Sequence, residues 1–235
     1  MSLISTSTLD TRPVLLDLFC CAGGAAMGYH RAGFRVIGVD IEDQPNYPFE
    51  FHQGDALEFL DALPRQGHGL AAIHTSPPCQ ASSALTKGTN RGRFYLNLIP
   101  ETRELLSEFD IPTVIENVQG ADMRRDLTLC GEMFGLSVIR HRYFEVRNFG
   151  VEQPEHKKHR GRVAGYRHGE WFDGPYFAVY GEGGGKGTVA QWQKAMGIDW
   201  TSVRKEIAEA IPPAYTEYVG GQIMATINYR EEVAS

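Results

Sequence analysis

The 235-residue chain has few cysteines and no long apolar run, and each shortage excludes a class of protein. The four cysteines, two of them adjacent at Cys20 and Cys21, follow no zinc-binding spacing and make a disulfide framework implausible. We therefore expect reduced thiols, no metal and a cytoplasmic location. No apolar stretch approaches the roughly 18 residues of a membrane span, and residues 1–11 lack the apolar core of an export signal. We therefore expect no membrane partner, and we expect a monomer.

Apolar residues make up 42% of the chain and charged residues 22%, which is typical of a globular domain with its own core. The net charge of −6 gives no general preference for nucleic acid. Between Arg140 and Arg167, however, there are eight lysines and arginines against three acids. We expect a small, irregular, basic insert at 145–187, within a main domain formed by 1–144 and 188–235. A basic surface interleaved with aromatic residues favours nucleic acid, although a solvated loop would have the same composition.

Apolar runs alternate with helical patterns, which predicts an α/β fold with a mostly parallel sheet. The first run leads into a turn of small residues ending at Gly23 and Gly24. Such a turn lets a ligand approach the backbone, and Asp40 ends the next strand where a ribose-binding acid is expected. This pair of features fits a nicotinamide enzyme as well as a methyltransferase. The predicted strands are 14–19, 35–40, 51–55, 70–73, 111–115 and 136–146, and the predicted helices are 25–32, 56–63, 99–109, 188–196, 202–211 and 214–227.

Cys79 directly follows a strand that is stopped by Pro77 and Pro78, because proline cannot donate to a sheet ladder. A free cysteine is most often a small buried hydrophobe. At the carboxyl end of a parallel strand, where open α/β sheets place their ligands, a thiol is also a candidate nucleophile. The sequence around Cys79 alone leaves both interpretations open.

Glu116 and Asn117 follow another predicted strand, so they are expected at the same edge of the sheet as Cys79. Glu116 is a second catalytic candidate, although a helix cap or a surface acid is the commoner role of such a residue and is favoured by this segment alone. In the predicted strand 136–146, alternation places Arg140 and Arg142 on one face, where both side chains can reach one anion or carbonyl.

Two glycine-containing segments lie outside the predicted strands and helices. The polar stretch 81–94 is either a lid over a polyanion or a solvated loop. The stretch 181–187 is not a phosphate-binding loop, since Gly187 stands where that motif needs Ser or Thr. We interpret it as a flexible hinge.

Taken together and in this order, the motifs resemble those of the DNA (cytosine-5)-methyltransferase family, in a short form with a small target-recognition insert. The resemblance runs from Asp17 to about Phe144 and, more weakly, over 188–220. It is carried by Asp17-Leu18-Phe19 with Gly23-Gly24 (cofactor motif), Asp40 (ribose acid), Asp55 (adenine contact), Pro78-Cys79-Gln80 (nucleophile motif), Glu116-Asn117-Val118 (base-binding motif) and Arg140 with Arg142 and Phe144 (arginine motif).

The resemblance implies a Rossmann-like sheet with helices on both faces that binds S-adenosylmethionine. It implies methyl transfer to carbon 5 of a flipped-out cytosine in double-stranded DNA through a covalent Cys79 adduct, as in restriction-modification. Asp55 would also cap the helix 56–63. The implied catalytic residues are Cys79, Glu116, Asn117, Arg140 and Arg142; the cofactor-binding residues are Phe19, Cys21, Ala22, Gly23, Gly24, Asp40, Ile41, Asp55 and Pro78; the DNA-binding residues are Gln80, Ser82, Ser83, Lys87, Arg91, Arg93, Lys157, Lys158 and Arg160.

The sequence departs from the family pattern at three places. The family usually has glycine where Cys21 stands, glutamine at Val138, and a Gly-Asn pair at Ala208-Glu209. Cys21 and Glu209 would lie near the amino-acid end of the cofactor. The alternatives are a related pyrimidine carbon-5 modifier that acts on RNA or uses a modified donor, a catalytically inactive DNA-binding relative, and a nicotinamide dehydrogenase.

Overall fold

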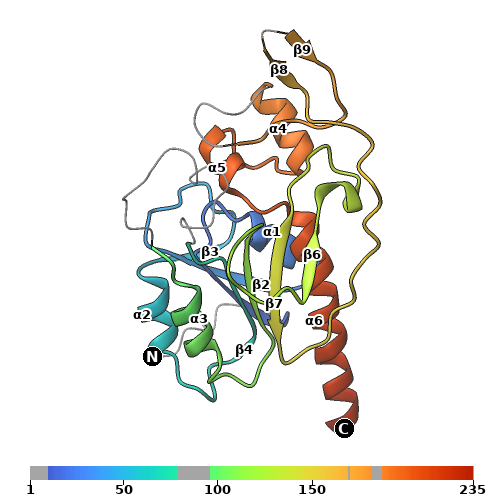
Figure 1. The fold of residues 1–235 in the computed structure, drawn as a ribbon. Helices are drawn as coiled ribbons and strands as arrows, with labels where there is room; N and C mark the ends of the chain where they lie inside the picture. The colour runs from blue at the N-terminus through green and yellow to red at the C-terminus, as the bar shows by residue number, and fades with distance from the viewer. Residues whose placement is uncertain (1–9, 79–95, 169, 181–186, 235) are drawn as a thin grey trace.

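The computed structural model describes residues 10–78, 96–168, 170–180 and 187–234 (Figure 1). Its strands are β1 (Val14–Leu18), β2 (Arg35–Asp40), β3 (Glu50–Gln53), β4 (Leu70–Thr75), β5 (Thr113–Val118), β6 (Leu127–Leu129), β7 (Arg142–Arg147), β8 (Gly165–Arg167) and β9 (Glu170–Phe172). Its helices are α1 (Gly24–Arg31), α2 (Ala56–Asp61), α3 (Ile99–Leu106), the 3₁₀ turn η2 (Gly131–Phe134), α4 (Val189–Met196), α5 (Arg204–Glu209) and α6 (Pro213–Ala234).

A seven-stranded sheet in the order β3-β2-β1-β4-β5-β7-β6 forms the centre of the molecule. The five strands from β3 to β5 are parallel, and β7 runs antiparallel to both β5 and β6. Because the carboxyl ends of the parallel strands share one edge, the segments that follow β1, β2 and β4 and the end of β5 meet there.

Helices cover both faces of the sheet, as the sequence predicts (Figure 1). Alternate residues of one strand, Leu15 and Leu16, belong to different cores. Leu15 packs with residues of α1 and α6, and Leu16 packs with residues of α2 and with Leu106 of α3. Because β1 is buried on both faces, it needs apolar residues on both, and its sequence is apolar except at Asp17.

Helices α1 and α6 pack closely because α1 carries glycines along one side. A Cβ on Gly24 would lie 2.4 Å from the carbonyl oxygen of Ile211, and one on Gly28 would lie 2.1 Å from that of Pro213. The Thr216 hydroxyl donates to the carbonyl of Ala25 across the same contact. The glycines of α1 therefore position the start of α6, late in the chain, against a helix from its beginning.

Two of the differences between predicted and observed strand bounds move candidate site residues. β5 extends through Val118, so Glu116 lies within the strand and not after it. The strand predicted for 136–146 begins only at Arg142, because the ladders to β5 and β6 start at that residue and residues 136–141 pair with neither strand. Arg140 therefore lies outside β7, and alternation does not place it beside Arg142.

The segment after β7 is irregular apart from a short hairpin of β8 and β9. β7 itself runs to Arg147 in the main sheet, past the expected boundary at residue 144. Helices α4 and α5 form a separate small core around Trp192, Met196 and Ile207, above the sheet in Figure 1. Within the described residues, no helix combines the length and the hydropathy needed to cross a bilayer.

Gly28→Ala should lower the free energy of unfolding by about 1–3 kcal/mol, because the added methyl group has no room against Pro213 and Thr216. This loss would appear even though alanine favours a helix over glycine by about 1 kcal/mol. The matched control is Gly221→Ala in α6, where an added Cβ meets nothing within 4 Å. Urea unfolding followed by circular dichroism measures both; equal stability of the two variants would contradict the packing argument.

Candidate active site

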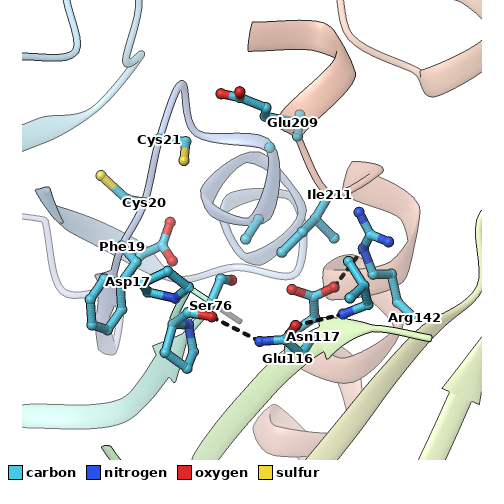
Figure 2. A pocket seen from close by; sticks show the side chains of 16 residues that line it. Asp17, Phe19, Cys20, Cys21, Ser76, Glu116, Asn117, Arg142, Glu209 and Ile211 are labelled. Carbon is cyan, nitrogen blue, oxygen red and sulfur yellow. Dashed lines mark hydrogen bonds and ion pairs between the residues drawn. The ribbon is translucent and has the colours of Figure 1, made fainter. Parts of the chain in front are cut away.

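A cavity of about 420 Å³ opens at the carboxyl edge of the parallel strands (Figure 2). This size is within the range of small-molecule sites. Its walls come from the turn after β1, the end of β4, the end of β5, the start of β7 and the segment joining α5 to α6. The lining residues are Asp17, Phe19, Cys20, Cys21, Gly24, Ala25, Ser76, Pro77, Pro78, Glu116, Asn117, Val118, Arg142, Glu209, Ala210 and Ile211.

The turn after β1 has an unusual backbone. Phe19 and Cys21 adopt φ +58° and +44°, and Gly23 adopts φ +85°. Positive φ at two residues that are not glycine is costly and is concentrated at functional sites. The Cys21 amide donates to the Asp40 carboxylate over 2.9 Å, which ties the turn to the end of β2. Burial raises the pKa of Cys21 to about 12, so its thiol is neutral.

Asp17 places a carboxyl group on the floor of the cavity (Figure 2). The residue is 0% exposed, and neither side-chain oxygen has a hydrogen-bond partner among the described residues. Burial, and then the charge of Asp40, raises the pKa of Asp17 well above its ordinary value. The Ala26 amide faces this carboxyl group and offsets the rise in pKa only in part. A buried carboxyl group with so little compensation needs a proton or a positively charged ligand.

Glu116 and Arg142 form an ion pair at the other side of the cavity. Arg142 Nε lies 2.8 Å from Glu116 Oε1, and Glu116 is 4% exposed. In the antiparallel register of β5 and β7, Arg142 stands opposite Val118, so Glu116 is its diagonal neighbour on the same face. Burial raises the pKa of Glu116, while Arg142 and Arg140 oppose the shift. The carboxyl group is therefore easier to protonate than a surface glutamate.

A buried chain of hydrogen bonds ends at Ser76, which lines the cavity. The Tyr29 hydroxyl lies 2.9 Å from His74 Nδ1, and His74 Nε2 lies 3.0 Å from the Ser76 hydroxyl. Both ring nitrogens of the buried His74 therefore have a hydroxyl partner, one from α1 and one from the segment after β4. The Ser76 hydroxyl also acts on Glu116, where it lowers the pKa and so opposes the effect of burial.

Asn117 fastens the turn that precedes Cys79. Its Nδ2 donates to the carbonyl of Pro77 over 2.8 Å, and its Oδ1 accepts from the Val118 amide. The segment that follows the carboxyl end of β4 is thus held against β5. Cys79 itself lies outside the described residues, as do the predicted lid 81–94 and most of the predicted hinge 181–187.

Arg140 has different partners from Arg142. Its guanidinium donates to the carbonyls of Val179 and Ala208, over 3.2 and 2.6 Å. Burial, and then the charge of Arg142, lowers the pKa of Arg140 to about 9. Arg140 does not line the cavity; it joins the segment after the hairpin to α5.

Four of the predicted cofactor residues line the cavity: Phe19, Cys21, Gly24 and Pro78. Asp55 caps α2 as predicted, accepting from the amides of Leu57 and Glu58. Ala22, Gly23, Asp40, Ile41 and Asp55 are not in the lining, although Ile41 is 67% exposed beside Asp40. Asp17, Val118 and Glu209, which the sequence analysis placed in or near the motifs without assigning them a binding role, also line the cavity. The sequence prediction gave no site role to Cys20, Ala25, Ser76, Pro77, Ala210 and Ile211.

The basic residues of the insert line a second cavity, of about 450 Å³. Arg160 is paired with Glu132 at 2.6 Å, whereas Lys157 lies 4.0 Å from Glu155 and Lys158 has no ion-pair partner among the described residues. Lys158, and Lys157 with only this distant and exposed partner, could therefore bind an anion. The other predicted DNA contacts, Gln80, Ser82, Ser83, Lys87, Arg91 and Arg93, lie outside the described residues.

Solved structures of known proteins share this architecture over nearly its whole length. A DNA modification methyltransferase encoded within a prophage of E. coli is 15% identical, with 92% of this chain and 99% of that chain covered and a TM-score of 0.61. The S. pombe Dnmt2 methyltransferase is 13% identical, with 92% and 100% covered and a TM-score of 0.58. The methyltransferase EhMeth of Entamoeba histolytica is 12% identical, with 93% and 99% covered and a TM-score of 0.60.

The chain has the fold of S-adenosylmethionine-dependent methyltransferases. No protein-family model matches the sequence, and no curated protein matches it either. In this methyltransferase fold, the cavity described above lies where open α/β sheets bind ligands, outside the carboxyl ends of the strands.

The buried His74 should make the stability of the fold depend on pH. Burial lowers its pKa to about 3, against 6.5 in an unfolded chain. Between these values the unfolded state binds more protons, so stability falls as the pH falls, by up to about 1.4 kcal/mol per pH unit. His74→Gln should remove this part of the slope in urea unfolding between about pH 6.5 and 4.

Tyr29→Phe is the matched control, because it removes the partner of His74 but keeps the titrating ring. This variant should lose stability and keep the wild-type slope. A wild-type slope in His74→Gln would contradict the assignment.

Proposed function

We propose that the protein transfers a methyl group from S-adenosylmethionine to carbon 5 of a flipped-out cytosine in double-stranded DNA, through a covalent adduct with Cys79. The observation that carries the proposal is the buried pair of Glu116 and Arg142, set in one cavity with the unpaired Asp17. Glu116, an acid that can be protonated, suits a nucleobase that must be polarised. Asp17, a carboxyl group on the other side of the cavity, suits a positively charged methyl donor.

The donor side is supported by the carboxyl group of Asp17 and by the turn after β1. S-adenosylmethionine carries an ammonium and a sulfonium group, and either one would compensate the charge of Asp17 if it ionised. The left-handed turn from Phe19 to Gly23 lets a ligand approach the backbone. Ile41 offers an apolar surface to a purine ring, and Asp40, already bonded to the turn, fixes its position. When bound, the donor supplies an activated methyl group.

Glu116 and Arg142 are assigned to the base. Adding a thiolate to carbon 6 of cytosine makes carbon 5 nucleophilic but places negative charge on the ring. Glu116, whose pKa is raised by burial, would protonate or hydrogen-bond ring nitrogen 3. Arg142 would bind the carbonyl oxygen of the base and withdraw charge.

Cys79 is assigned as the nucleophile because it directly follows Pro78, which lines the cavity. Asn117, through the Pro77 carbonyl, would position the chain on which Cys79 lies. A free thiol has a pKa of about 8.5, so cationic neighbours must favour the thiolate. Arg140 serves as a positioning residue in this scheme, because its guanidinium donates hydrogen bonds to two carbonyls and does not line the cavity.

The DNA is assigned to the face with the insert, residues 145–187, as a small target-recognition region. Lys157 and Lys158 would contact phosphates there, and Trp171 and Phe172 of the hairpin are exposed on β9. Phosphate contacts would stabilise the duplex while the base, at a cost of a few kcal/mol, leaves the stack.

The proposed activity is tested by incubating the purified chain with S-adenosylmethionine and either duplex DNA or RNA, then identifying methylated nucleosides by mass spectrometry. We expect 5-methylcytosine from duplex DNA. Cys79→Ser should abolish the product. Glu116→Gln should lower kcat by about 10²–10⁴ with little change in KM, because proton donation acts in the reaction step and less in binding.

The fold of each variant is verified by its circular dichroism spectrum and thermal midpoint. Methylated RNA without methylated DNA would replace the proposed substrate by the RNA alternative. Full turnover by Cys79→Ser would remove the covalent mechanism, and binding of DNA without any product would favour an inactive relative.

Replacing Lys157 and Lys158 together by glutamine should weaken duplex binding and reduce the slope of log affinity against log salt by up to about 2, since each lysine would release counterions from one phosphate. Fluorescence anisotropy across a salt series measures the slope. The control, Arg31→Gln with Arg230→Gln, removes the same charge from the last turn of α1 and from the C-terminal half of α6. An unchanged slope in the lysine variant would place the DNA elsewhere.

A further inference from the structure

Three histidines and one cysteine from separate segments converge beside the active site. Cys130 follows β6, His141 precedes β7, and His156 and His159 lie in the irregular segment of the insert. One side-chain nitrogen or sulfur of each lies within 4.8 Å of the corresponding atoms of all the others. Cys130 is buried, His141 and His159 are half-buried, and His156 is exposed.

The distances within this cluster are those of ligands around one tetrahedral ion. His156 Nε2 lies 3.3 Å from His141 Nε2 and 3.2 Å from His159 Nε2, and His159 Nε2 lies 3.4 Å from Cys130 Sγ. A zinc ion with bonds of about 2.0–2.1 Å to nitrogen and 2.3 Å to sulfur separates its ligand atoms by roughly 3.3–3.6 Å. The other three pairs of ligand atoms lie within 4.8 Å of each other.

Hydrogen bonding alone cannot satisfy this arrangement. Each ring nitrogen is either a donor or an acceptor with a single lone pair, but His156 Nε2 faces two other Nε2 atoms and His159 Nε2 faces both a ring nitrogen and a sulfur. Whichever tautomers are chosen, a donor must be shared between two acceptors or two donors must share one lone pair. A cation at the centre accepts one lone pair from every member.

We propose that Cys130, His141, His156 and His159 bind one zinc ion. A thiolate with imidazole nitrogens is a ligand set that suits zinc, and four protein ligands leave no open position, which is the arrangement of a structural site. This proposal replaces the expectation of no metal, which rested on the spacing of the cysteines. It is independent of the methyltransferase reaction.

The ion would join the insert to the catalytic edge of the sheet. His141 lies between Arg140, bonded to the carbonyls of Val179 and Ala208, and Arg142, paired with Glu116. His156 adjoins the lysines of the second cavity, and the nearby Arg160–Glu132 pair fixes the same segment. Zinc binding would therefore hold the arginine segment and the basic insert in a fixed relative position.

Metal content is the direct test. The full chain, produced without a histidine tag in medium containing zinc and dialysed, should carry about one zinc per chain in mass spectrometry of the metals. His156→Asn removes an exposed ligand. Changing a residue that only orients a metal ligand lowers metal affinity roughly 10- to 100-fold, and losing the ligand itself should lower the zinc affinity by more than that. Adding Zn²⁺ to the metal-free wild type should raise its thermal midpoint, and should not do so in His156→Asn.

His168→Asn is the matched control, because His168 is an exposed histidine outside the cluster and asparagine tolerates its φ of +50°. This variant should retain wild-type zinc. Co²⁺ in place of zinc should give the wild type a thiolate-to-cobalt charge-transfer band that Cys130→Ser lacks, which separates a bound ion at this site from one held elsewhere.

The proposal is overturned if the dialysed wild type holds no zinc and its thermal midpoint does not respond to Zn²⁺. It is also overturned if His156→Asn and Cys130→Ser keep the same zinc as His168→Asn, since the ion would then lie at another place.

Discussion

The antiparallel pairing of β7 with β5 is the constraint on which the rest of the site depends. It places Arg142 diagonally across from Glu116 on one face, so a guanidinium meets a carboxyl group that burial would otherwise leave without compensation. A parallel strand at this position would have needed a long crossover connection and another register. The same pairing brings Glu116, Val118 and Arg142 into one wall of the cavity, and the charge of Arg142 limits the rise in the pKa of Glu116 that burial causes.

The sheet and its helices were predictable because local signals and the fold agree. Continuous apolar runs marked the buried parallel strands, and Asp55 marked the start of α2. Glu116 was found from its neighbours in the sequence, but its place inside β5 was not. The start of β7 at Arg142 was missed because it is set by pairing with β5 and β6, which overrides the alternating pattern before it.

Other parts of the site gave no signal in the sequence. His74 stands in an apolar run and looks like an ordinary strand residue, and only the fold brings Tyr29 and Ser76 to its two nitrogens. The cluster around Cys130 is assembled from segments with no fixed spacing, so a search for zinc motifs does not detect it. Such constellations depend on tertiary structure, and no local period or propensity encodes them.

The wall formed by Glu209 to Ile211 comes from late in the chain, whereas the opposite wall, Asp17 to Gly24, comes from its beginning. Closing the cavity therefore requires a contact between residues separated by most of the sequence, of the kind that forms slowly. During synthesis the early strands can assemble on the ribosome, but the ligand pocket is complete only once α5 and the first turn of α6 have emerged. A nascent chain would thus have a hydrophobic sheet before it could gain stability from a bound ligand.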